Sequence, residues 1–141
     1  MVPHPIIVDF AVALLVVSVA FDLLASIVDE RDLRIVGWWT LMIGTVSAAL
    51  AVLSGFAAAK IAAAEPPIVE TITLHRNLGI ATLTCFATCA VWRAGAMGTF
   101  PRRYPDAYWA LTAVGLGTLV VTAYFGGILV FRLGVGFVTP V

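Results

Sequence analysis

Four long apolar segments constrain the fold of this chain more than any other feature. They cover approximately residues 5–28, 36–63, 74–97 and 107–131. An α-helix needs roughly 20 apolar residues to cross the hydrocarbon core of a bilayer, and each segment reaches that length. With 62% hydrophobic and 11% charged residues, the chain is too apolar for a soluble domain. The sequence therefore predicts an all-α protein, a single four-helix transmembrane bundle over residues 1–141 with the lipid bilayer as its solvent.

The charged residues restrict the partners and indicate an orientation. The net charge is zero and the basic residues form no patch, which argues against a nucleic-acid partner. No basic residue precedes position 31, so the first segment lacks the positive start of a cleaved signal peptide and should remain as a span. The basic residues divide five to three between the two sides of the membrane: Arg31, Arg34, Arg93, Arg102 and Arg103 against Lys60, Arg76 and Arg132. Because basic loops favour the cytoplasm, both termini are expected on the outer, periplasmic side.

The chain has two histidines, and they stand at matching places in the pattern. His4 lies just ahead of the first apolar segment and His75 begins the third. Alternate spans run in the same direction, so both imidazoles are expected at the outer end of the bundle. A polar ring at the edge of lipid is costly to desolvate, which suggests either a ligand-binding site or an interfacial ring among headgroups. Residues 68–74 are compatible with a loop or with an earlier start of the third helix.

Three further residues are candidates for a site beside the histidines. Arg76 and Arg132 belong to the same outer surface, where they can hold an anionic group or extend to lipid phosphates. Gly79 lies one turn beyond His75 and leaves volume that either a flat ligand or close helix packing can use. Both readings stay open for each residue.

Two acidic residues interrupt the first span. Asp9 lies about one turn below His4, and we expect it to find a partner in Arg76, Arg132 or His75. Asp22 lies close to the inner end, where its side chain can reach water.

Periodicity groups further residues of the second and third spans. On the third span, one helix face is shared by His75, Gly79, Thr82, Phe86, Cys89 and Arg93. On the second, a stripe of small residues predicts close approach of a neighbouring helix: Gly44, Ala48, Ala51, Gly55 and Ala59.

Several short motifs, in order and over essentially the whole chain, resemble a known bacterial membrane family. They are HPIIVDF (4–10), AVALL (11–15), FDLL (21–24), HR (75–76), GGILVF (126–131) and GVG (134–136). The family is domain of unknown function 2231. The resemblance implies a four-helix, multi-pass protein of the bacterial inner membrane. Some members are fused to Rieske iron–sulfur or c-type cytochrome modules, which implies an association with respiratory electron transfer. Members usually carry a histidine where this chain has Asp9, so a role of that imidazole does not carry over.

Three functions are compatible with this pattern. In the first, His4 and His75 are the axial metal ligands of a b-type haem that passes electrons at the outer face. Arg76 and Arg132 then pair with the haem propionates, and Gly79 leaves room for the edge of the macrocycle. The alternative is a cofactor-free accessory subunit of a larger respiratory or photosynthetic complex, or a homo-oligomer. A third is a transporter or proton path through Asp9, His75 and Arg76. No carboxylate pair or nucleophile–base spacing indicates an enzyme with its own catalytic centre.

Overall fold

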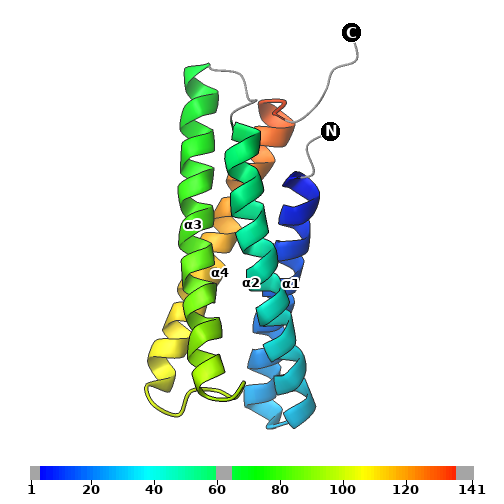
Figure 1. The fold of residues 1–141 in the computed structure, drawn as a ribbon, viewed down its shortest axis with the longest axis vertical. Helices are drawn as coiled ribbons and strands as arrows, with labels where there is room; N and C mark the ends of the chain where they lie inside the picture. Colours follow the sequence, from blue (N-terminus) through cyan, green and yellow to red (C-terminus); the bar gives the residue numbers. More distant parts are fainter. Residues whose placement is uncertain (1–3, 60–64, 136–141) are drawn as a thin grey trace.

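The computed structural model is a bundle of four long helices (Figure 1) and describes residues 4–59 and 65–135. The elements are α1 His4–Val28, α2 Arg31–Ala59, α3 Pro66–Gly95, α4 Pro105–Gly127 and a π-helical turn, η1, Ile128–Arg132. All four helices are long and apolar enough to cross a membrane. Within the described ranges there is no strand. The predicted all-α, four-helix transmembrane fold is confirmed.

The helix boundaries differ from the expected ones mainly at their starts. The second helix begins at Arg31 instead of near residue 36, and the third begins at Pro66, so residues 68–74 are helical. Pro66 and Pro105 each occupy the first turn of a helix, where the missing N–H has no intrahelical partner to lose. The expected end of the second span, at residue 63, lies outside the described residues. His75 is consequently well inside α3.

The helices run alternately up and down. Each packs against its neighbours in the chain, α1 mainly on α2 and α3 mainly on α4, while α1 and α3 lie diagonally opposite without close backbone contact in the described ranges. Residues 29–30 alone connect α1 to α2. The starts of α1 and α3 and the end of η1 therefore meet at one end of the bundle (Figure 1). We call it the histidine end, because His4 and His75 lie there, and the opposite one the ion-pair end, for reasons given below.

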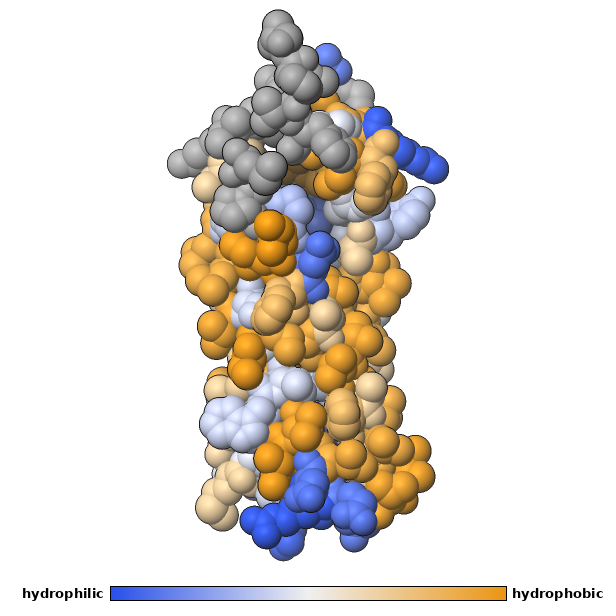
Figure 2. All heavy atoms as spheres, turned by 90° about the vertical axis from the view of Figure 1, so that its right-hand side faces the viewer, coloured by the Kyte–Doolittle hydropathy of each residue, from blue (hydrophilic) through white to orange (hydrophobic). Residues whose placement is uncertain are grey.

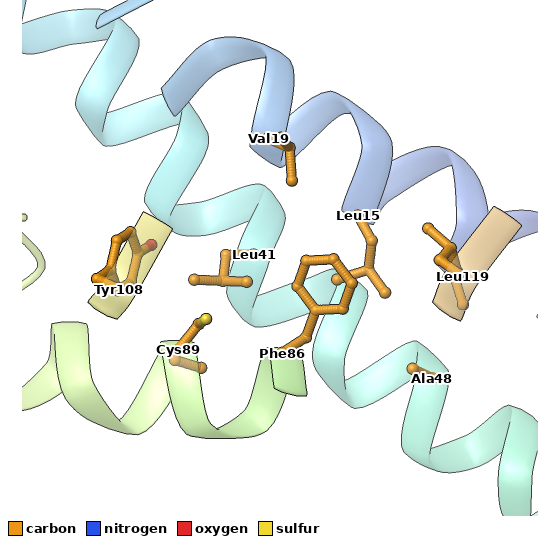
Figure 3. Close-up of a cluster of buried hydrophobic side chains, with 10 residues drawn as sticks. Leu15, Val19, Leu41, Ala48, Phe86, Cys89, Tyr108 and Leu119 are labelled. Atoms are coloured by element: carbon orange, nitrogen blue, oxygen red, sulfur yellow. The ribbon is translucent and has the colours of Figure 1, made fainter. Parts of the chain in front are cut away.

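The core is built from side chains of all four helices. Figure 3 shows Leu15 of α1, Leu41 of α2, Phe86 of α3 and Leu119 of α4 converging on one cluster. The predicted small-residue stripe on α2 serves this packing: a Cβ on Gly44 would lie only 2.9 Å from Leu15 Cδ2. Without a hydrophobic drive between helices in lipid, such close contact is what holds them together.

The face of the bundle seen in Figure 2 is mainly apolar over its middle, and hydrophilic residues gather at the lower end. Large hydrophobic side chains are exposed on every helix, for example Phe10, Leu53, Val91 and Val120. A soluble protein rarely exposes so much contiguous apolar surface. This surface is the one that the bilayer covers.

Candidate functional site

The structure brings the two histidines together across the bundle. The ring centroids of His4 and His75 are 6.5 Å apart, and the ring planes are nearly perpendicular, at 87°. The two rings come from α1 and α3, the diagonal pair, so they meet in the interior between all four helices. Both side chains are partly buried. The expectation that both imidazoles lie at the same end is confirmed.

Each imidazole is held by a hydrogen bond to a different neighbouring helix. His75 Nδ1 donates to the backbone carbonyl of Thr122 on α4 at 2.9 Å. His4 Nδ1 lies 2.8 Å from the hydroxyl of Ser54 on α2, and that hydroxyl donates to the carbonyl of Ala51 at 3.0 Å. All four helices thus contribute to the arrangement of the two rings.

A glycine lies against each ring. A Cβ at Gly55 on α2 would be 3.1 Å from His4 Cε1, and a Cβ at Gly126 on α4 would be 3.1 Å from His75 Cε1. These distances are shorter than ordinary van der Waals contact, so any larger residue would displace the imidazole. Gly55 belongs to the stripe predicted for helix packing. Its position beside His4 could not be inferred from spacing.

The other three candidate residues form no hydrogen bond or ion pair with the two imidazoles in the described part of the chain. Gly79 faces α4, where Thr122 Cγ2 would be the nearest atom to an added Cβ, at 3.8 Å. Arg76 is half-buried, with its guanidinium 5.7 Å from the centre of the Phe56 ring. Arg132 ends the π-helical turn and is exposed. In the described part of the chain neither arginine forms an ion pair.

Asp9 does not join this site, contrary to expectation. It is exposed, and no ion pair joins it to Arg76, Arg132 or any other residue in the described ranges. The reason is helix rotation, since the buried positions of α1 run through Ala11 and Leu15, and Asp9 lies on the far side of that stripe. The interior path through Asp9, His75 and Arg76 therefore lacks its first member.

A second polar site, at the opposite end, involves Asp22. This residue does not reach water: it is 2% exposed and forms an ion pair with Arg93, which is 0% exposed. Arg93 Nη1 donates to Asp22 Oδ2 at 2.6 Å. Asp22 lies on the buried stripe of α1. Arg93 ends the α3 face that begins at His75, and that face is buried at Phe86 and Cys89.

Arg93 also ties the remaining parts of this end together. Its Nη2 donates to the carbonyl of Arg34 on α2 at 3.2 Å and to that of Gly98 in the α3–α4 loop at 3.0 Å. The guanidinium lies 5.4 Å from the Trp38 ring and 5.1 Å from the Phe100 ring. In the sequence, Arg93 groups with the basic residues of one membrane side and lies on the His75 face of the third span. No periodicity indicated that Asp22 is its partner.

These features define a class, the four-helix integral membrane proteins with polar groups buried at both ends of the bundle. The family model of the predicted membrane proteins DUF2231 matches residues 3–139, nearly the whole chain, and the protein belongs to that family. No curated protein and no solved structure matches the chain. The family predicted from the motifs is confirmed.

Proposed function

We propose that this membrane protein is a b-type cytochrome subunit in which His4 and His75 ligate one haem iron. The observation that carries the proposal is the proximity of the only two histidines in the chain, with ring centroids 6.5 Å apart on diagonal helices. A haem iron accepts one imidazole on each face, and helix bundles supply such ligands from facing helices.

The ring separation fits a shared metal ion. Metal–imidazole bonds are roughly 2 Å long, so two imidazoles on opposite sides of one metal have centroids about 6 Å apart. In residues 4–59 and 65–135 no group of three or more His, Cys, Asp or Glu side chains gathers as a metal site. A closed tetrahedral zinc site takes four protein ligands. Two imidazoles therefore suit a metal whose remaining ligands belong to a cofactor, as the porphyrin nitrogens do in haem.

The remaining residues would bind and orient the group. Bound haem supplies one-electron transfer. Arg76 and Arg132, whose guanidinium groups are not in ion pairs with described residues, would hold its propionates. Gly79 would make room for its edge against α4. The site would lie at the outer face of a bacterial inner membrane, and its partners would be respiratory modules such as a Rieske or c-type cytochrome protein.

The test is a reduced-minus-oxidised absorption spectrum of the detergent-purified protein, expressed with sufficient haem. We expect low-spin b-type bands and close to one haem per chain. His4→Ala and His75→Ala should each abolish these bands while leaving membrane insertion intact, because neither residue contributes much apolar area. Asn77→Ala is the matched control, since Asn77 is an exposed polar residue two positions from His75 on α3.

Two results would contradict the haem proposal. Full low-spin bands in both histidine variants would exclude bis-histidine ligation. A featureless spectrum of the haem-supplied wild-type protein would overturn the haem proposal and favour the alternative, a cofactor-free accessory subunit of a larger membrane complex. Co-purification of the tagged protein from its native membrane would then identify that complex.

A further inference from the structure

We infer that the histidine end is preset for metal ligation through Nε2: Ser54 and the Thr122 carbonyl hold both imidazoles in the Nδ1–H tautomer. The inference deepens the proposed function and rests on it only for the identity of the ligand. It assigns Ser54 as a positioning residue.

The tautomer of His75 follows from its partner. A backbone carbonyl has no proton to give, so it can only accept a hydrogen bond. Because His75 Nδ1 lies 2.9 Å from the Thr122 carbonyl oxygen, the proton is on Nδ1. In the neutral ring the lone pair is then on Nε2.

The tautomer of His4 follows from a chain of two hydrogen bonds. The Ser54 hydroxyl has one proton, and it donates that proton to the Ala51 carbonyl at 3.0 Å. Its oxygen is therefore left to accept, and the group 2.8 Å away is His4 Nδ1. A proton on His4 Nδ1 satisfies both contacts, and the lone pair is again on Nε2.

The two rings thus share one chemical state although they use different partners on different helices. Ligating histidines in proteins typically donate their second ring N–H to a carbonyl, carboxylate or water, which fixes the ring and raises its basicity. Gly55 and Gly126 complete the arrangement, because a Cβ at either position would lie only 3.1 Å from the Cε1 atom of the adjacent ring. An imidazole that only lies among lipid headgroups does not require a fixed Nδ1 hydrogen bond or a glycine packed against its ring.

The inference can be tested without any haem. The haem-free full-length protein, labelled with 15N-histidine in detergent micelles, gives two imidazole spin systems because the chain has two histidines. Nitrogen shifts distinguish a protonated from an unprotonated ring nitrogen. We expect protonated Nδ1 and unprotonated Nε2 on both rings. A proton on Nε2 of His75 would overturn the inference.

Variants at position 54 test the positioning role. Ser54→Ala should move His4 toward the Nε2–H tautomer and leave His75 unchanged, and Ser54→Thr should restore His4. The matched control is Ser26→Ala, because the Ser26 hydroxyl makes the same bond to a carbonyl three residues earlier, 2.7 Å from Leu23 O, at an exposed site. An unchanged His4 tautomer in Ser54→Ala would refute the role of Ser54.

A redox titration of the haem-loaded protein links the tautomer to function. The Ser54 bond makes His4 a more basic ligand, which favours ferric iron, so Ser54→Ala should raise the midpoint potential and Ser54→Thr should return it toward the wild-type value. An unchanged potential in Ser54→Ala would contradict the positioning role. If the wild-type protein binds no haem but both rings carry Nδ1–H, the tautomer inference stands and the proposed haem function fails.

Discussion

The two ends of the bundle bury polar groups in different ways. At the ion-pair end, Asp22 and Arg93 are of opposite charge and form a buried ion pair, and Arg93 also donates to two backbone carbonyls. At the histidine end, Nδ1 of His4 and Nδ1 of His75 each form a hydrogen bond to a neighbouring helix. The charged groups of the ion-pair end bind each other and the backbone of this chain, whereas the two imidazoles of the histidine end can still coordinate a metal.

This difference indicates a division of labour. An ionised side chain within a membrane is tolerated when it pairs inside the protein, and breaking a buried pair leaves an uncompensated charge. The ion-pair end is thus suited to holding α1, α2, α3 and the loop after α3 in one arrangement. The histidine end depends on that arrangement to keep α1 and α3 at the distance where their rings meet.

The largest expected effect is at the buried pair. Arg93→Leu leaves the Asp22 carboxyl buried without its partner, and should lower the free energy of unfolding by about 3–5 kcal/mol in a denaturant titration in mixed micelles. The control is Arg34→Leu, which removes an exposed pair: Arg34 Nη1 lies 2.9 Å from Asp29 Oδ1, with the side chains 32% and 88% exposed. That variant should cost about 0–1 kcal/mol.

The double variant Asp22→Leu/Arg93→Leu sharpens the same test. It removes both charges, so most of the lost stability should return. If Arg93→Leu is as mild as Arg34→Leu, the ion-pair end does not hold the bundle together and the comparison fails.

The next effect is at Gly37 on α2. A Cβ there would overlap Asp22 Oδ1, and the carbonyl of Gly37 accepts a hydrogen bond from Ser18 at 3.0 Å. Gly37→Ala should therefore displace the carboxylate and cost about 1–3 kcal/mol of unfolding free energy. Gly117→Ala on α4 is the matched control, because nothing lies within 4 Å of its added Cβ. That control should gain up to about 1 kcal/mol from helix propensity.

At the histidine end the expected effect is on ligand affinity. Gly126→Ala places a methyl group 3.1 Å from His75 Cε1, so the ring must shift by a few tenths of an ångström. We expect roughly tenfold weaker haem binding in a titration of the haem-free protein, with little change in unfolding free energy. Gly117→Ala again serves as the control on the same helix. Unaltered affinity in Gly126→Ala would show that His75 is not held against α4.

The smallest effect is expected at Asp9. Because it is exposed and no ion pair joins it to a described residue, Asp9→Asn should change the unfolding free energy by no more than about 0.5 kcal/mol and leave the haem spectrum unaltered. If Asp9→Asn abolished electron transfer but left the haem spectrum normal, the result would instead indicate that Asp9 takes part in proton or ion movement.

The candidate site could be predicted from the sequence only in part. Alternate spans run in the same direction, so His4 and His75 were expected at one end, and the structure has them there. Nothing in the sequence indicates that Ser54 and Thr122 lie beside the two histidines. Hydroxyl residues are common in membrane helices, and a carbonyl acceptor such as that of Thr122 has no side-chain signature.

The sequence by itself determined the number of helices and their approximate ends, because the length and continuity of apolar segments are local properties. It also determined the family, through short motifs in a fixed order. Only the tertiary structure decided the rotation of each helix, with Asp9 outside, Asp22 inside and Arg93 as its partner. In lipid, side chains that face the bilayer and those that face the core are both apolar. The apolar pattern therefore does not mark the inner face, and contacts with the neighbouring helices select it.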